Sequence, residues 1–315
     1  MSDNMPNVKR IAITGCTGSI GTALIRLCIE QGIEVCAFVR GNSKRVDRIP
    51  KHSLVNIVEC DLSELSEFDA QSCPKCDVFY HLGWGATIGG GRNDMPTQID
   101  NIRYTIDAVT LANELGCHTF VGTGSQAEYG RFEGKLNADV FVNPENGYGI
   151  AKLAAGYMSR IECGKYGMKH IWTRILSVYG PGDSELTMVS QLISKLLKGE
   201  KPSLTKGEQQ WDYLYVDDAA RALYLLGSKG KDGQIYCIGS GVAHPLISYI
   251  EQIRDAVNPG AELGVGEVPY GEKQVMYLCA DISKLTEDTG FVPQISFKDG
   301  IKKTVEWWKE KGING

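Results

Sequence analysis

The fold is decided by one stretch of sequence, Ile11-Ala12-Ile13-Thr14-Gly15-Cys16-Thr17-Gly18-Ser19-Ile20-Gly21. A short apolar run, typical of a buried strand, leads into three glycines spaced three apart, and helical spacing of apolar residues follows over 19–31. Gly15 permits a tight turn, Gly18 lets the backbone approach a phosphate, and Gly21 lets the helix pack close to the strand. The alternative is a turn with chance glycines. We predict a dinucleotide phosphate site, because the amides at the start of such a helix attract anions.

Strands and helices alternate over the first 180 residues. Apolar runs predict strands at 8–14, 33–39, 54–59, 77–82 and 118–122, and helical spacing predicts a long helix over 98–115. This order is typical of an α/β fold with a Rossmann doubly wound parallel sheet. After residue 180 the pattern is less regular. We therefore expect an NAD(P)-binding Rossmann domain over 1–180 and a smaller C-terminal α/β substrate lobe over 181–315, with some chain crossing back to the Rossmann sheet.

The composition argues against several classes of protein. The 315 residues carry 33 Lys+Arg against 38 Asp+Glu, a formal net charge of −5, without the basic excess of a nucleic-acid partner. No apolar run approaches the ~20 residues that span a bilayer, and segment 1–7 is polar. We expect a cytoplasmic protein that binds neither nucleic acid nor membrane. Cys73 and Cys76 have the spacing of half a zinc site, but no second ligand pair follows, so we expect no metal.

The residues after the second predicted strand bear on the cofactor. NAD sites of this type carry Asp or Glu about 20 residues past the glycines, where it bonds the ribose hydroxyls. In this chain Arg40 stands there, and Ser43, Lys44 and Arg45 follow. A guanidinium can bind the 2′-phosphate of NADP through two parallel hydrogen bonds, whereas a carboxylate would repel it. We expect NADP(H), with NAD(H) possible and a solvated basic loop as the alternative.

Further candidates follow the third and fourth predicted strands. Asp61 is placed either to bond the adenine amino group or to cap a helix over 63–69. The fourth strand runs into Trp84, at the edge where open parallel sheets bind ligands. The Gly-rich segment 87–96 contains Arg92, and we expect it to be a mobile lip over the substrate.

Ser125, Tyr148 and Lys152 form the candidate catalytic group. Tyr148 and Lys152 are four residues apart at the start of a predicted helix, so they share one helix face. A free tyrosine hydroxyl titrates near pH ~10, and we expect the nearby ammonium to lower that pKa by favouring the phenolate. Tyr148 would then exchange a proton with a carbonyl or alcohol while hydride moves to or from a cofactor, and Ser125 would hold the same oxygen. The spacing alone is common; the glycine turn and the serine give it meaning.

These residues resemble the extended short-chain dehydrogenase/reductase family, in its NAD(P)-dependent group of nucleotide-sugar epimerases, dehydratases and 4-ketoreductases. The resemblance covers nearly the whole chain and rests on Thr14-Gly-x-x-Gly-x-x-Gly21, Asp61-Leu62, His81-Leu82-Gly83, Asn101, Ser125, Tyr148-x-x-x-Lys152, Arg174-Ile-Leu-Ser-Val-Tyr-Gly-Pro181, Asp212-Tyr-Leu-Tyr-Val-Asp-Asp218, Ala280-Asp281-Ile-Ser-Lys-Leu285 and Gly290-Phe-Val-Pro293. It implies a homodimer formed through the helices that start near 98 and 148, and a small-molecule substrate, a nucleotide sugar.

The residues and the resemblance together give the expected binding sites. The expected cofactor-binding residues are Gly15, Thr17, Gly18, Ser19, Ile20, Gly21, Arg40, Ser43, Lys44, Asp61, Leu62, Leu82, Gly83, Trp84, Asn101, Tyr148, Lys152, Leu176 and Val178. The expected substrate-binding residues are Trp84, Arg92, Gln126 and Trp211.

Departures from the family pattern narrow the reaction. The similar 4,6-dehydratases place Asp-Glu directly after the catalytic hydroxyl residue, where this chain has Gln126 and Ala127. Without that acid and base we disfavour a dehydratase. Glu128 comes two positions later than the family's Asp, and we expect it to point elsewhere.

Other departures concern the nucleotide. Trp211 stands where many relatives carry a pyrophosphate-binding Arg, a second family Arg is missing around 269–271, and Ser177 replaces an Asn. Trp211 either stacks on a base or sugar or simply packs. Either the nucleotide is held by Arg92, Arg131 or Lys201 instead, or the substrate is not a nucleotide sugar.

Three hypotheses remain open from the sequence. The first is NADPH-dependent reduction of a 4-keto nucleotide sugar. The second is a nucleotide-sugar 4-epimerase that retains NAD. The third is a regulatory NADP-binding protein without catalysis. Arg40 and Lys44 favour the first, because epimerases of this family usually retain NAD.

Overall fold

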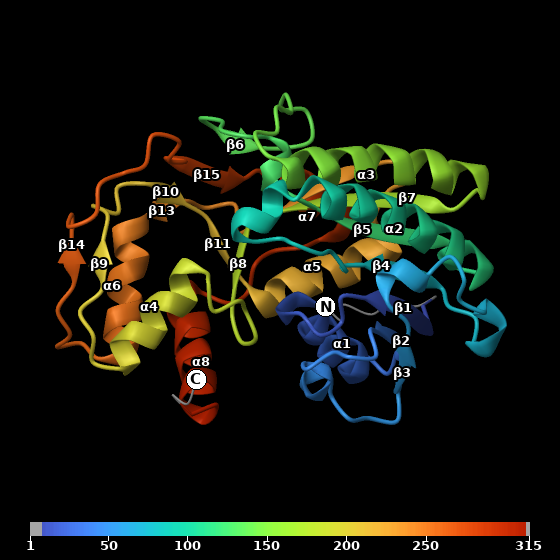
Figure 1. The fold of residues 1–315 in the computed structure, drawn as a ribbon, viewed down its shortest axis with the longest axis horizontal. Helices are drawn as coiled ribbons and strands as arrows, with labels where there is room; N and C mark the ends of the chain where they lie inside the picture. The colour runs from blue at the N-terminus through green and yellow to red at the C-terminus, as the bar shows by residue number, and fades with distance from the viewer. Residues whose placement is uncertain (1–7, 313–315) are drawn as a thin grey trace.

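The computed structural model describes residues 8–312, so the expectation for segment 1–7 lies outside the described residues. A seven-stranded sheet forms the large layer, and all neighbouring strands are parallel in the order β12-β7-β5-β4-β1-β2-β3 (Figure 1). Its strands are β1 (Arg10–Thr14), β2 (Glu34–Val39), β3 (Val55–Glu59), β4 (Val78–His81), β5 (Thr119–Ser125), β7 (Lys169–Ile175) and β12 (Ile235–Ile238). The chain starts at the middle and winds outward both ways, which confirms the predicted Rossmann sheet.

Helices cover both faces of this sheet (Figure 1). α1 (Ser19–Glu30) and α5 (Val216–Lys229) pack together on one face, and α2 (Met95–Glu114) and α3 (Gly147–Lys165) pack together on the other. Successive side chains of each strand point to opposite faces of the sheet. Ile11 and Ile13 join the core beneath α1 and α5, whereas Ala12 joins the core beneath α2. Burial on both faces explains why the strands are continuous apolar runs.

Part of the segment expected to be a mobile lip forms a turn that is hydrogen-bonded to its neighbours, and its mobility stays a prediction. Residues Gly89–Asn93 form a short 3-10 helix (η4), and α2 begins at Met95 and not at 98. The Gln98 side chain donates to the carbonyls of Ala86 and Gly91, at 3.1 Å each. The Asn93 side chain accepts from the amide of Gly147 at 2.9 Å. These bonds tie the turn to both α2 and α3.

A smaller lobe lies beside the carboxyl ends of the large sheet (Figure 1). Its helices are α4 (Met188–Leu197), α6 (Leu246–Val257) and α8 (Phe297–Glu310), while α7 (Ser283–Thr289) packs on α5 and β12. Its small sheets are β13 (His244–Pro245), β10 (Gln210–Trp211), β15 (Tyr277–Ala280) and β6 (Lys135–Leu136); β11 (Tyr213–Tyr215) with β8 (Ser177–Tyr179); and β14 (Gly264–Val265) with β9 (Ser203–Leu204).

The chain crosses between the two parts in both directions. β6, from the first half of the chain, adds a strand to the sheet of the small lobe, and β12 returns from the second half to the edge of the large sheet. The boundary at residue 180 stays a prediction. In the described part of the chain, no helix combines the length and the apolar character needed to cross a bilayer.

Candidate active site and cofactor cleft

The glycine turn between β1 and α1 has the geometry of a phosphate cradle. Gly15 has φ +69°, and a Cβ there would lie 2.5 Å from the carbonyl carbon of Leu82. A Cβ at Gly21 would lie 2.5 Å from the carbonyl oxygen of Gly15, so α1 packs closely on the turn only because this residue is glycine. Gly18 caps α1, and no side chain satisfies the first amides of the helix. These amides are available to an anion, so the turn fits a dinucleotide pyrophosphate.

A cleft of ≈ 510 Å³ extends from this turn along the strand ends. The predicted cofactor residues that line it are Gly15, Thr17, Gly18, Arg40, Ser43, Asp61, Leu62, Leu82, Gly83, Trp84 and Asn101. The predicted cofactor residues outside its lining are Ser19, Ile20, Gly21, Lys44, Tyr148, Lys152, Leu176 and Val178. Eleven of the predicted residues thus line one cleft, and the cofactor roles of both sets stay predictions.

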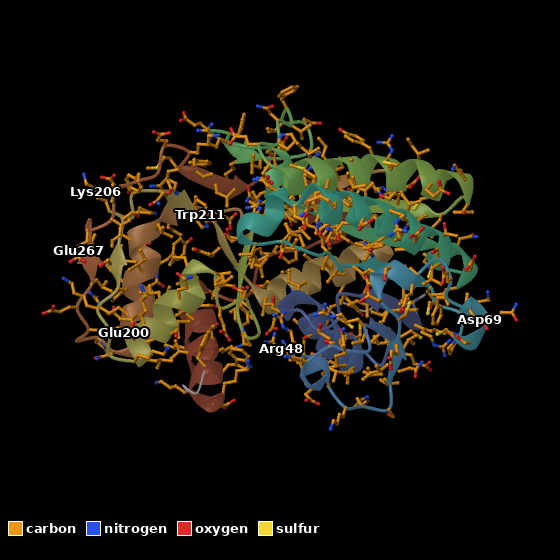
Figure 2. All side chains as sticks on the ribbon, viewed as in Figure 1. Arg48, Asp69, Glu200, Lys206, Trp211 and Glu267 are labelled. Carbon is orange, nitrogen blue, oxygen red and sulfur yellow. The ribbon has the colours of Figure 1, made fainter. Side chains whose placement is uncertain are left out.

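One end of the cleft is basic. Arg40, Ser43 and Arg45 line it, whereas Lys44 does not. The cofactor residues predicted from the sequence included Lys44 but not Arg45. The sequence does not show which side chain faces the cleft, because that depends on the path of the loop. Arg48, in the same loop, donates to the carbonyl of Gly182 at 2.9 Å and so ties this loop to the chain after β8 (Figure 2).

Two predicted cofactor residues have structural partners. The Asp61 side chain accepts from the amide of Ser63 at 3.2 Å and caps the 3-10 helix Leu62–Glu64 (η2). The capping alternative for Asp61 is thus observed, although Asp61 still borders the cleft. The Asn101 amide group bonds both backbone groups of Gly85, at 2.9 and 3.1 Å. Asn101 therefore fixes the chain that follows β4.

The three candidate catalytic residues come together beside the cleft. Ser125 ends β5, and Tyr148 and Lys152 lie on the first turns of α3. The Lys152 ammonium donates to the carbonyl of Thr123 at 2.5 Å and lies 3.6 Å from the ring centroid of Trp84. Its distance to the ring centroid of Tyr148 is 5.9 Å. In this structure the ammonium is directed at a carbonyl and an indole ring.

The pKa values of this group differ from the sequence prediction. Burial raises the pKa of Tyr148, while a hydrogen bond with Ser125 and the charge of Arg92 oppose that rise. The predicted lowering of this pKa by Lys152 is not seen. Burial lowers the pKa of Lys152 to about 7, although the charge of Glu128 opposes that change. Tyr148 is therefore held in its protonated form at neutral pH.

Glu128 lies buried beneath Ser125. Its carboxylate accepts from the Ser125 amide at 2.9 Å, from the Trp172 indole at 3.1 Å and from the Arg174 guanidinium at 2.7 Å. Burial raises the pKa of Glu128, and the Arg174 charge and these hydrogen bonds oppose that rise. Glu128 points away from the cleft, as expected. The sequence did not reveal its partner, which is far along the chain.

The remaining predicted substrate residues lie at different distances from Tyr148. The Arg92 guanidinium lies over the ring of Tyr148, with Cζ 4.8 Å from the centroid. Gln126 is half-buried and begins the short turn Gln126–Glu128 (η5). Trp211 belongs to the small lobe (Figure 2), and its indole donates to the hydroxyl of Ser177 at 2.8 Å. The structure thus brings Arg92 to the catalytic group and gives Trp211 a packing partner.

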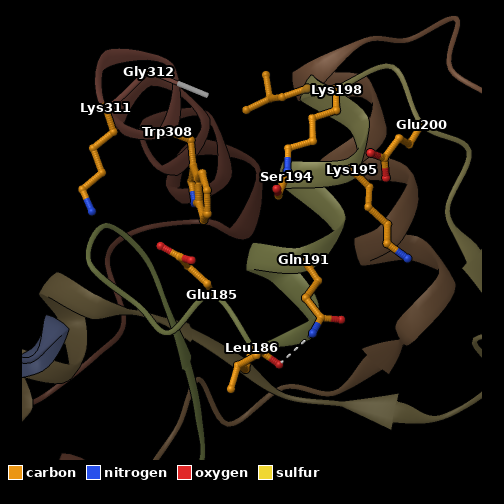
Figure 3. Close-up of a pocket in the computed structure, with 11 residues that line it drawn as sticks. Glu185, Leu186, Gln191, Ser194, Lys195, Lys198, Glu200, Trp308, Lys311 and Gly312 are labelled. Atoms are coloured by element: carbon orange, nitrogen blue, oxygen red, sulfur yellow. Dashed lines mark hydrogen bonds between the residues drawn. The ribbon is translucent and has the colours of Figure 1, made fainter. Parts of the chain in front are cut away.

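A larger hollow of ≈ 560 Å³ lies elsewhere, between α4 and α8 (Figure 3). Its walls include Glu185, Gln191, Lys195, Lys198, Trp308 and Lys311. None of the predicted site residues lines it. The chemistry of the chain is therefore assigned to the smaller cleft at the strand ends.

Sequence relatives include curated dehydratases. A dTDP-glucose 4,6-dehydratase of Neisseria meningitidis serogroup B is 24% identical over 348 aligned residues, covering 98% of this chain and 97% of that protein. The dTDP-glucose 4,6-dehydratase 1 of Escherichia coli K12 is 32% identical over 176 residues, covering 52% and 48%.

Solved structures share the fold. A UDP-N-acetylglucosamine 4-epimerase from Methanobrevibacter ruminantium M1, in complex with UDP-N-acetylmuramic acid, superposes with a TM-score of 0.86 at 21% identity, covering 96% of this chain and 99% of that one. A UDP-glucuronic acid 4-epimerase from Bacillus cereus in complex with NAD gives 0.82 at 20% identity, covering 96% of each chain. The model of the NAD dependent epimerase/dehydratase family matches residues 11–239. The chain therefore belongs to this family of NAD(P)-dependent nucleotide-sugar enzymes, of the extended short-chain dehydrogenase/reductase type.

Proposed function

We propose that this enzyme reduces the 4-keto group of a nucleotide-activated sugar with NADPH. The observation that carries the proposal is the basic end of the cleft, which Arg40, Ser43 and Arg45 line. A planar guanidinium suits a 2′-phosphate, which distinguishes NADP from NAD. An enzyme that exchanges NADP(H) every turnover performs net reduction or oxidation, whereas an epimerase re-reduces the carbon that it oxidises.

The chain's own residues supply the proton for such a reduction. A free tyrosine is already protonated at neutral pH and burial raises the pKa of Tyr148 further, so Tyr148 can donate to the carbonyl oxygen of the substrate. Ser125 hydrogen-bonds the same oxygen and keeps it in line with that hydroxyl. Lys152, whose pKa burial lowers to about 7, stabilises in its charged form the phenolate that remains. The nicotinamide cofactor supplies the hydride when bound.

The residues after Ser125 argue against elimination of water. Gln126 and Ala127 carry no group that titrates near neutral pH. The carboxylate of Glu128 is enclosed by the Ser125 amide, Trp172 and Arg174. Although dehydratases are among its relatives, this chain offers neither an acid nor a base to the sugar at the residues that follow Ser125.

The cofactor itself provides the decisive test. We would identify by mass spectrometry the cofactor released from freshly purified protein, and titrate the protein with NADPH and NADH. Loosely bound NADP(H), clearly preferred over NAD(H), is the expected result. Stoichiometric NAD(H) that survives purification would refute the proposal and favour the 4-epimerase. Binding of NADP(H) with no turnover of any keto sugar would favour the regulatory protein.

We also propose that the enzyme is a homodimer joined through α2 and α3. Both helices expose apolar side chains: Met95, Ile99, Ile150, Tyr157, Met158 and Ile161. Ile99 and Ile161 are 65% and 67% exposed, and large apolar patches mark association surfaces. Sedimentation velocity should show a dimer that Ile161→Glu dissociates. Val242→Glu, at an exposed position of the small lobe, serves as the control. A wild-type monomer would contradict the dimer.

A further inference from the structure

Arg92 is a cation at the catalytic centre without an anionic partner. Its Nε is buried and has no hydrogen-bond partner, and within residues 8–312 no carboxylate forms an ion pair with it. Its guanidinium nevertheless lies over the ring of Tyr148, where substrate chemistry takes place. A buried donor without an acceptor is unfavourable unless a ligand satisfies it.

The other two cations considered for the nucleotide are already neutralised. Arg131 donates to both oxygens of Glu145, at 2.9 and 3.0 Å. The Lys201 ammonium lies 2.7 Å from the carboxylate of Glu267. The structure therefore distinguishes Arg92 from the alternatives that the sequence left open.

The backbone that carries Arg92 is fixed beside α3. The amide of Gly147, the residue before Tyr148, donates to the side chain of Asn93. A Cβ at Gly147 would lie 3.1 Å from the carbonyl oxygen of Arg92, so the two segments touch closely. The base of the arginine is thus preorganised next to the catalytic tyrosine.

The charged groups nearby do not provide the missing partner. Lys152 is a second cation, directed at Thr123 and Trp84. The carboxylate of Glu128 is occupied by Arg174. An additional anion at this point must therefore come from a ligand.

We propose that Arg92 binds an anionic oxygen of the substrate, a carboxylate or a phosphate, beside Tyr148. The proposal rests on the proposed function and adds the chemical class of group that the substrate presents there. The planar fork of a guanidinium matches both anions through two hydrogen bonds. In a nucleotide sugar the anion has two sources. One is the pyrophosphate, and the other is a carboxylate at C6, which is attached to the ring carbon next to C4.

Chemical protection tests the site without a variant. Wild-type protein loaded with NADP⁺ is treated with phenylglyoxal, and modification of Arg92 is read by peptide mapping. Inorganic pyrophosphate, UDP-glucose and UDP-glucuronate are the probes. Protection of Arg92, with unprotected Arg254 as the internal control, is the expected result. If none of the three probes protects Arg92, the proposal is overturned.

Binding to variants identifies the source of the anion. Calorimetry on the same holoprotein should show that Arg92→Gln weakens binding by about 10- to 100-fold. Arg92→Lys should recover part of this loss, and Arg254→Gln should bind as the wild type does. A loss for both nucleotide sugars indicates the pyrophosphate, whereas a loss confined to UDP-glucuronate indicates the sugar carboxylate. Unchanged binding in Arg92→Gln would refute the anion role.

Hydride transfer, read from the absorbance of the reduced nicotinamide, separates this proposal from the proposed function. Protection of Arg92 by pyrophosphate without turnover of any keto sugar supports the anion site and contradicts the reductase. Turnover of a keto sugar with a lowered kcat but an unchanged KM in Arg92→Gln contradicts the anion site and leaves the reductase standing.

Discussion

Glu128→Gln tests whether a buried ion pair holds the catalytic centre together. The side chains of Glu128 and Arg174 are 0% and 1% exposed. Glutamine has nearly the same shape and keeps an oxygen that can accept from the Ser125 amide. It removes the negative charge, however, and leaves the guanidinium of Arg174 buried without a counter-charge.

The expected loss is large because the pair is fully buried. Breaking a buried pair by removing one partner costs about 3–5 kcal/mol, since the remaining charge is neither hydrated nor paired. For a chain of this size, the loss corresponds to a fall in Tm on the order of 10 °C. The kcat should fall by about 10-fold or more, because the backbone of Ser125 loses a charge-assisted hydrogen bond and its hydroxyl moves out of line.

Denaturant unfolding and steady-state kinetics measure the two effects separately. Glu145→Gln is the matched control, because the ion pair of Glu145 with Arg131 lies at the surface. The side chains of Arg131 and Glu145 are 44% and 33% exposed. Such exposed pairs contribute only about 0–1 kcal/mol. The double variant Glu128→Gln/Arg174→Met removes both charges and should regain stability but not kcat. If Glu128→Gln unfolds within about 1 kcal/mol of the wild type, the reasoning about the buried pair is refuted.

Four further outcomes are expected. Tyr148→Phe should abolish turnover and leave cofactor binding nearly intact; a rate above about a tenth of the wild type would contradict its role as proton donor. Arg40→Asp should weaken NADPH more than NADH, and an equal loss in the two titrations would show that Arg40 does not discriminate between them. The kcat/KM should fall as pH rises through about 7, because Lys152 then loses its proton. This fall with pH should be absent in Lys152→Arg, because the arginine side chain stays charged. The unfolded chain keeps that proton up to 10.5, so stability should also rise with pH between 7 and 10.5.

The sheet was predictable because its signals are local. Apolar runs and the glycine turn place most strand ends within a few residues of the observed ones. β5 was predicted to stop at Gly122 but continues to Ser125, since pairing of Gly124 and Ser125 with β7 extends it and no local pattern reveals that pairing. α2 begins earlier than predicted, because Pro96 was assigned to a loop although proline is compatible with a first helical turn.

The membership of the site stays a prediction, and its geometry could not be read from the sequence. Spacing alone put Tyr148 and Lys152 on one face of α3. The direction of the ammonium depends on Trp84, which follows β4, and on the carbonyl of Thr123 in β5. The pKa of Tyr148 depends on burial, which spacing does not show. The direction of the Lys152 ammonium and the pKa of Tyr148 thus depend on long-range packing, which the motif does not reveal.

The residues around Ser125 fit one of two reactions of this family, hydride transfer, and not the other, elimination of water. Hydride transfer needs a hydroxyl to pass a proton, and Tyr148 with Ser125 keeps that half in this chain. Elimination of water needs a second acid and a base beside the neighbouring carbons, and at those positions the chain carries Gln126 and Ala127. Glu128 serves the core and not the sugar, so the proposed reductase function requires a sugar that arrives already oxidised at C4. Under that proposal, the reaction that supplies the substrate is one that produces a 4-keto sugar.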